Sequence, residues 1–118
     1  MREPPSIDAW GGGGFRVSGV WRPGSLLILD DAPRAWAPAR VGELEPTDFA
    51  EIIAAGPAVS EFVLLGAGVT SALPPRAVRD AIEAAGLGFE FMASDAAARL
   101  HNLLASEGRR FATALIAV

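Results

Sequence analysis

The first candidate for chemistry is a pair of glycines that directly follows an apolar run. Gly66-Ala67-Gly68 comes after Phe62-Val-Leu-Leu65, which reads as a buried strand. Glycines in this position bring backbone N–H groups close to a phosphate. A dinucleotide fingerprint also needs a small residue that opens a helix at once, but Ser71 stands there and Pro74-Pro75 delay the helix. Three interpretations stay open: a tight structural loop, a nucleotide site completed by Glu90, and an anion or small-ligand pocket.

A second candidate is a polar face near the end of the chain. Asp95 and Arg99 are spaced i, i+4, and Asn102 follows Arg99 at i+3, so a helix places all three side chains together. Glu107 and Arg109 stand beside the end of the same helix. This face is either a ligand or partner site, or a solvated surface with one ion pair worth roughly 0.2–0.5 kcal/mol. Together with Gly66 and Gly68, these residues are the candidate binding residues.

The sequence offers no recognisable catalytic or metal-binding constellation. His101 is the only histidine and cysteine is absent, so thiolate metal sites are excluded and a histidine cluster cannot form. A Ser-His-Asp arrangement with Ser94 or Ser106 has no support from spacing, and we expect His101 to be structural. Gly11 to Gly14 lack the Lys and Ser/Thr of a phosphate-binding loop and predict a hairpin connection. We expect no cofactor and no metal.

The elements that must position these residues follow from the pattern of apolar residues. The second half reads strand–helix–strand–helix–strand, which favours a partly parallel sheet with helices packed on it. The strand-rich first half predicts hairpins that join the same sheet. We therefore expect one α/β domain over residues 1–118, with three layers, a central mixed β-sheet and an N-terminal β-hairpin region. The expected strands are 7–10, 15–20, 25–29, 62–65, 87–92 and 111–118, with a short one near 40–41; the expected helices are 48–55, 77–85 and 94–107.

Particular residues set the expected helix ends and faces. Thr47 is the predicted N-cap of the first helix, and Ser94 that of the last. Gly108 stands where a glycine that ends a helix belongs. The last helix is expected to bury a face made of Ala96, Leu100, Leu103 and Leu104.

Composition narrows the classes of partner. The formal net charge is −4, and the ten basic residues are all Arg, scattered among fourteen acids. Nucleic acid and anionic membrane surfaces are poor partners for such a chain, because they need clustered positive charge. No apolar run approaches the ~20 residues that span a bilayer, so direct membrane insertion is not expected. The N-terminal segment lacks the apolar core of a signal peptide, which makes the cytoplasm the expected location.

Several of these residues belong to one longer pattern. It consists of Gly14-Phe15-x-Val17-x-Gly19, Gly24-Ser25-Leu-Leu-Ile-Leu, Trp36, Leu65-Gly66-x-Gly68, Met92, Asp95-Ala-Ala97-x-Arg99-x-x-Asn102-x-Leu104 and Glu107-Gly108-Arg109-Arg110. This pattern resembles a known family of small domains of poorly defined function. Its members include a mitochondrial respiratory complex I assembly factor (NADH dehydrogenase assembly factor three) and the adipogenesis-associated domain protein. The part from Met92 to Val118 is the most specific.

The resemblance implies a three-layer α/β fold with a central mixed sheet, and no accepted catalytic residue, cofactor or metal. The mitochondrial member resembles a non-catalytic assembly protein. The chain departs from the family at Trp10, where Tyr is frequent, and at Leu100-His101, where Thr and an aromatic are frequent. Asp30 also stands where the family often has Pro.

Two functional hypotheses result. The favoured one is a non-catalytic protein-interaction or assembly-factor-like module, linked to respiratory or membrane complexes by the resemblance alone, with a protein partner whose identity the sequence does not give. The alternative is a small-molecule or anion-binding protein, or an enzyme, with its site between Gly66–Gly68 and the helix that starts near Asp95. The sequence does not fix the oligomeric state.

Overall fold

A computed structural model describes residues 2–118 of the chain. A five-stranded mixed sheet lies at its centre. From edge to edge, its strands are β5 (Ala32–Trp36), β4 (Ser25–Leu29), β8 (Ala112–Leu115), β6 (Phe62–Gly66) and β7 (Gly88–Met92). β4 runs antiparallel to both β5 and β8, whereas β6 runs parallel to both β8 and β7.

A second, three-stranded antiparallel sheet is formed by β1 (Ile7–Gly11), β2 (Gly14–Val17) and β3 (Val20–Pro23). The expectation that the hairpins of the first half all join the large sheet is therefore wrong: only β4 and β5 do so, and Gly24, with φ +81°, separates β3 from β4. Gly12 and Gly13 both have positive φ and form the β1–β2 turn, so the glycine run is the expected hairpin connection. The single strand expected over 15–20 is wrong: Ser18 and Gly19 also have positive φ and turn the chain back, which splits that segment between β2 and β3.

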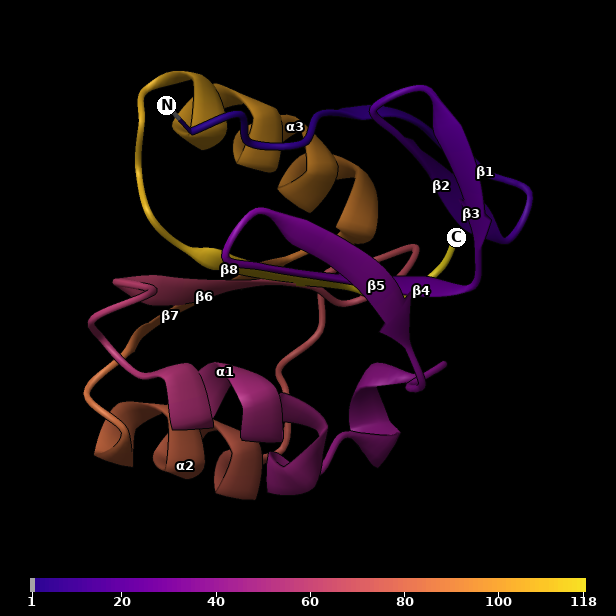
Figure 1. The fold of residues 1–118 in the computed structure, drawn as a ribbon. Helices are drawn as coiled ribbons and strands as arrows, with labels where there is room; N and C mark the ends of the chain where they lie inside the picture. Colours follow the sequence, from indigo (N-terminus) through magenta and orange to yellow (C-terminus); the bar gives the residue numbers. More distant parts are fainter. Residues whose placement is uncertain (1) are drawn as a thin grey trace.

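Helices cover both faces of the large sheet and give the three expected layers. α1 (Ala50–Ala55) and α2 (Arg76–Ala84) lie on one face, while α3 (Ser94–Ser106) and the small sheet lie on the other (Figure 1). Strand residues alternate between these layers. Leu27 and Leu29 belong to the apolar cluster on the α1 and α2 side, and Leu26 and Ile28 to the cluster under α3. Burial on both faces explains why β4 is an uninterrupted apolar run.

The region between β5 and α1 differs from expectation. The short strand expected near 40–41 is wrong, because Val41–Glu43 is a 3₁₀ helix. A second 3₁₀ turn, Pro46–Phe49, leads into α1. Thr47 is not the cap: Glu45 precedes the turn, and its backbone N–H donates to Asp48 Oδ2 at 2.8 Å.

The buried face of α3 is not the expected one. Leu103 is 55% exposed and Leu100 and Leu104 are only partly buried, whereas the residues against the sheet are Ala97, Ala98, His101 and Ala105. Small side chains let the helix axis lie close to the sheet, which moves the larger leucines to its flank. Apolar periodicity weights leucine over alanine and therefore selects the wrong stripe.

The two ends of α3 show one error and one confirmation. Ser94 is not the N-cap, since Ala93 precedes the helix in that position and Ser94 is its first residue. At the other end, Gly108 has φ +75°, its N–H donates to Ala105 O, and the Arg109 N–H donates to Leu104 O. These two bonds form the Schellman closure that ends many helices.

Candidate functional site

The Gly66–Gly68 loop packs directly onto the first turn of α3. The buried hydroxyl of Ser94 accepts the Gly68 N–H at 3.0 Å and donates to Ile116 O at 2.7 Å. A Cβ on Gly66 would stand 2.7 Å from both Ser94 Oγ and Leu115 Cδ2. Gly66 thus permits the close approach of strand and helix, and the Gly68 N–H is already used within the fold.

A small cavity of about 210 Å³ does lie where Gly68 and Asp95 meet. Trp10, Val69 and Val118 complete its lining. Asp95 accepts the Ala96 N–H at 2.8 Å and stands 3.6 Å from Arg99. This cavity is smaller than the ~300–1,000 Å³ of most ligand pockets, and a carboxylate at its wall repels anions.

Arg99 and Asn102 face the small sheet. The Arg99 guanidinium lies 5.1 Å from the centre of the Trp10 ring. Asn102 uses both ends of its amide on one residue: Oδ1 accepts the Ile7 N–H and Nδ2 donates to Ile7 O, each at 2.8 Å. These contacts hold β1 against α3.

The remaining predicted residues lie at the other end of α3. Glu107 is exposed at the helix C-terminus. Arg109 stacks over Phe62 at 5.4 Å and stands 3.4 Å from Glu61. The structure therefore spreads the seven predicted residues over both ends and two flanks of α3, rather than around one cavity.

A larger cavity, of about 400 Å³, lies along the flank of α3 beside strand β7. We call it the edge groove, and it is lined by Phe62, Gly88, Phe89, Glu90, Leu100, Leu104 and Arg109. Of these, only Arg109 is among the binding residues predicted from the sequence, and Glu90 is predicted in a different role, as part of a nucleotide site. Two signals in the sequence could have indicated the edge groove: Glu90 is a lone charge within an apolar strand, and Leu100 and Leu104 are spaced i, i+4 on a helix.

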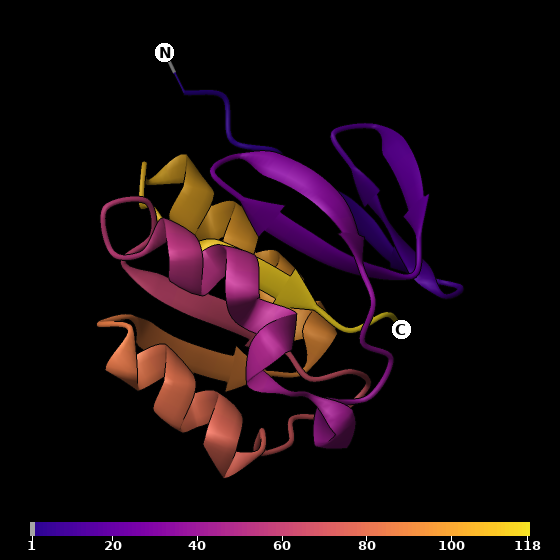
Figure 2. The ribbon, with the colours of Figure 1, turned by 60° about the horizontal axis from the view of Figure 1, so that its bottom comes forward.

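Strand β7 is the last strand of the sheet, and its outer side is unpaired (Figure 2). The Gly88 N–H donates to Glu61 O at 3.0 Å, and Met92 O accepts the Ala67 N–H at 2.7 Å. Residues along a strand direct their backbone groups alternately to either side. Gly88, Glu90 and Met92 therefore bond to β6, while the N–H and C=O groups of Phe89 and Phe91 point outward.

The buried His101 has a structural environment. Its Nε2 lies 2.8 Å from Pro5 O, and its Nδ1 lies 2.7 Å from Thr113 Oγ1. Because a carbonyl only accepts, Nε2 carries the proton and Nδ1 accepts from the threonine hydroxyl. Desolvation lowers the pKa of His101, opposed by the bond to Pro5 and the charge of Asp31. The neutral ring thus joins the N-terminal segment to α3 and β8.

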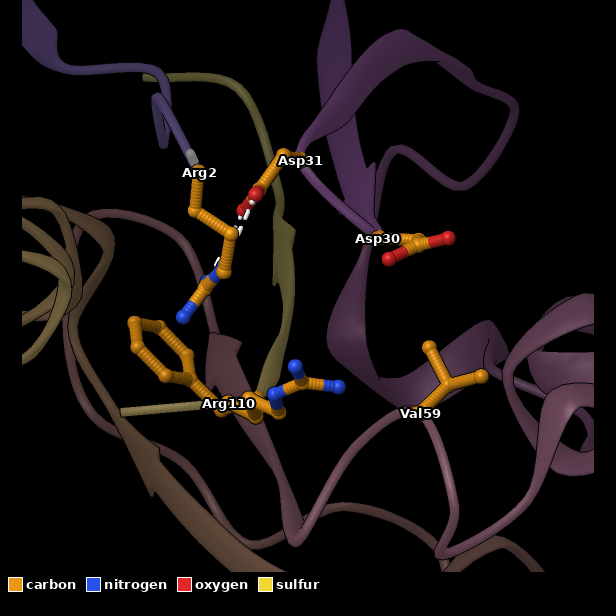
Figure 3. Close-up of a pocket in the computed structure, with 6 residues that line it drawn as sticks. Arg2, Asp30, Asp31, Val59 and Arg110 are labelled. Carbon is orange, nitrogen blue, oxygen red and sulfur yellow. Dashed lines mark hydrogen bonds and ion pairs between the residues drawn. The ribbon is translucent and has the colours of Figure 1, made fainter. Parts of the chain in front are cut away.

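A cluster of charges surrounds a third cavity, near the C-terminal end of α3 (Figure 3). Arg2 donates to both carboxylate oxygens of Asp31 at 2.9 Å, and to Gly108 O and Arg109 O at 3.2 Å. The hydrogen bond from Arg2 lowers the pKa of Asp31. Arg110 and Asp30 also line this space, but its volume of about 70 Å³ is too small for an organic ligand.

Residues 2–118 contain neither a metal-binding cluster nor a membrane-spanning helix. Within this range, no group of three His, Cys, Asp or Glu side chains is placed to hold a metal ion. The same range contains no helix that is long and apolar enough to cross a membrane.

Comparison with known proteins identifies the family. A family model described as "Protein of unknown function (DUF498/DUF598)" matches residues 7–116. The chain belongs to this family. An uncharacterised protein of Rhodobacter capsulatus is 36% identical over 112 residues, which cover 93% of this chain and 82% of that protein.

Solved structures share the fold over almost the whole chain. One is described as an outer membrane protein from Bartonella henselae; it superposes with a TM-score of 0.88 at 28% identity, over 98% of this chain and 96% of that one. Another is a Bordetella pertussis protein described as an Mth938-like domain, with a TM-score of 0.80 at 23% identity, over 98% and 90% of the two chains. At that identity, the second likeness shows the fold alone.

Proposed function

We propose that this DUF498 domain is a non-catalytic module that binds another protein. The observation that supports the proposal is the edge groove, a cavity of about 400 Å³ beside an unpaired strand edge. Its wall combines the apolar side chains of Phe62, Leu100 and Leu104 with the charges of Glu90 and Arg109. Apolar surface rimmed by a few charges is typical of protein-binding sites.

The chemistry of the titratable groups favours binding over catalysis. An enzyme needs a titratable group placed in a cavity and matched to a proton-transfer or nucleophilic task. His101 is buried with both nitrogens bonded, and Asp31 is paired with Arg2. The edge groove offers one carboxylate and one guanidinium, which suit recognition.

The class of partner comes from analogy. The mitochondrial protein that the sequence resembles is an assembly factor, and the Bartonella henselae neighbour is described as an outer membrane protein. We therefore propose a partner that belongs to a respiratory or membrane complex. This domain would contact it while remaining cytoplasmic.

Affinity capture from the native lysate at near-endogenous level, with identification by mass spectrometry, tests this function. We expect a reproducible partner that is lost when Glu90→Lys and Arg109→Glu are combined. Glu43→Lys is the matched control, because Glu43 is exposed in the 3₁₀ turn after β5, the opposite edge strand. Capture of nothing by the unmutated domain, or equal capture by all three proteins, contradicts the proposal.

The alternative function is a small-molecule or enzymatic site at the cavity between Gly68 and Asp95. An anion or nucleotide that binds there should raise the melting temperature, by the equivalent of about 2.7 kcal/mol at one hundred times its dissociation constant. Arg99→Ala should then abolish the shift. If phosphate, ATP and NAD all leave the melting temperature unchanged, this alternative loses its support.

A further inference from the structure

We infer that strand β7 is a docking edge for an extended segment of a protein partner, and that this segment places Arg or Lys opposite Glu90. The inference rests on the proposed function and specifies its binding mode. Addition of a strand to an exposed sheet edge obtains affinity from backbone bonds and specificity from alternate side chains.

The edges of the two sheets are not equally available. In the small sheet, the edge strand β1 is already bonded at Ile7 by Asn102. In the large sheet, the edge strand β5 contains Pro33, which lacks a donor and interrupts pairing. Strand β7 reads Gly-Phe-Glu-Phe-Met and contains no proline. Strand β3, the other edge of the small sheet, ends in Pro23, which also lacks a backbone donor. Of the four edge strands within residues 2–118, β7 is therefore the one best suited to accept another strand.

The backbone of β7 offers a defined set of bonds. Gly88 and Met92 direct their backbone groups toward β6 and the residues that flank it. Phe89 and Phe91, which alternate with them, therefore each present one N–H and one C=O to the open side. Within residues 2–118, neither phenylalanine has a backbone bond to a residue outside the sheet. An added strand thus gains up to four hydrogen bonds over a short length.

Side chains determine which strand fits. Phe89 and Phe91 pack against the cluster on the α1 and α2 side, so Glu90 faces α3 and the edge groove. Glu90 forms no ion pair with any residue in the range 2–118. A partner residue directly opposite Glu90 enters the same groove, where a cation pairs with the carboxylate. Apolar residues two positions away then face Leu100 and Leu104.

The same geometry disfavours a second copy of this chain as the occupant. Around a two-fold axis, antiparallel β7 strands form all their bonds only when Phe89 of one copy pairs with Phe91 of the other. That register places Glu90 opposite Glu90 in a non-hydrogen-bonded pair, with Cα atoms about 4.5 Å apart. Like charges directly opposite are destabilising. Registers shifted by two residues avoid this clash but keep only one of the two bonded pairs.

A lone charge on an edge strand can also serve to prevent aggregation through that edge. If this were the role of Glu90, added strands of different sequence would bind equally weakly, whereas docking requires that a strand with a cation opposite Glu90 binds more tightly. Two peptides therefore separate them: capped Val-Thr-Arg-Thr-Val, and the same peptide with Glu in the central position.

The experiment is a titration of the full-length ¹⁵N-labelled chain with each peptide, monitored by NMR. We expect saturable shifts of the Phe89 and Phe91 amides with the Arg peptide, and about tenfold weaker binding of the Glu peptide. Glu90→Lys should reverse this preference, whereas Glu43→Lys should leave it unchanged. The dispersed spectrum of each variant serves as the control for folding.

Three outcomes overturn the inference. They are the absence of saturable shifts at Phe89 and Phe91 with the Arg peptide, equal affinity for both peptides, and a dimer in solution whose interface protects β7. The proposed function fails separately. A captured partner that is lost in the combined variant Glu90→Lys, Arg109→Glu but retained by Glu90→Lys alone removes this binding mode and keeps a binding module. Peptide binding without any captured partner removes the module's proposed role.

Discussion

Asn102 on α3 bonds both backbone groups of Ile7, with its Oδ1 and Nδ2 each 2.8 Å from their partners. The side-chain amide thus takes the place of a neighbouring strand at the edge of β1. Together with Arg99 over Trp10, this contact fixes the small sheet on the helix.

Asn102→Ala should destabilise the fold. It leaves the part-buried N–H and C=O of Ile7 without a partner, at about 1–3 kcal/mol for each unsatisfied group. Urea unfolding followed by circular dichroism measures the loss, and exchange of the Ile7 amide locates it. Arg99→Ala is the comparison and should cost about 1 kcal/mol at most, because Arg99 is exposed, which weakens both its ion pair with Asp95 and its contact with Trp10. Unchanged stability and slow Ile7 exchange in Asn102→Ala would refute this structural role.

Gly66→Ala should destabilise through a steric clash. Its Cβ would lie 2.7 Å from Ser94 Oγ and 2.8 Å from Ser94 Cα, so α3 must move away from β6. We expect a loss of about 1–3 kcal/mol in the free energy of unfolding. Gly42→Ala is the matched control, since a Cβ there meets nothing within 4 Å and the backbone does not have positive φ. Equal stability of the two variants would mean that the approach of α3 to the sheet is not tight.

His101 should make stability depend on pH near neutrality. Because burial lowers the pKa of the folded ring below its ordinary value of 6.5, the unfolded chain binds more protons as the pH falls through 6.5. The free energy of unfolding therefore decreases as the pH is lowered from 7.5, and it stops decreasing once the pH is below the pKa of the folded ring. Urea unfolding at pH 7.5 and 5.5 measures this slope. His101→Gln should flatten it, and an unchanged slope in that variant would assign the effect to other groups.

The Arg2–Asp31 pair should make the free energy of unfolding depend on pH in the acid range, below the range set by His101. Hydrogen bonding to Arg2 lowers the pKa of Asp31 below its ordinary 3.8, so the stabilisation is complete above that value. It is lost as the pH falls through the lower pKa of the folded state. Asp31→Asn should cost about 0.5–1 kcal/mol at pH 7 and little in strong acid. Asp30→Asn is the control, and a double-mutant cycle with Arg2→Ala should show coupling only for Asp31.

Much of the fold follows from local sequence signals. The runs at 25–29 and 62–65 are apolar because each strand is covered on both faces. Gly108 ends α3 because the closing turn needs a positive φ, which glycine adopts without strain. The strand order does not follow from such signals. The C-terminal strand β8 lies between β4 and β6, and this order depends on contacts between segments far apart in the chain.

The candidate site was harder to predict for two physical reasons. Alanines rather than leucines face the sheet on α3, so Leu100 and Leu104 line a groove instead of filling the core. Serine is a residue type that often caps helices, but the Ser94 hydroxyl bonds instead to the Gly68 N–H and to Ile116 O. In both cases the tertiary contact, rather than residue type, decides what the side chain does.

Native-state hydrogen exchange of the β7 amides, measured by NMR on the free domain, tests most directly whether β7 is an open docking edge. The structure predicts fast exchange at Phe89 and Phe91 and slow exchange at Glu90 and Met92, because only the last two N–H groups point toward β6. Addition of the captured partner, or of the Arg peptide, should then slow Phe89 and Phe91 selectively. Equal protection of all four amides in the free domain would show that the edge is already covered and that β7 is not an open docking edge.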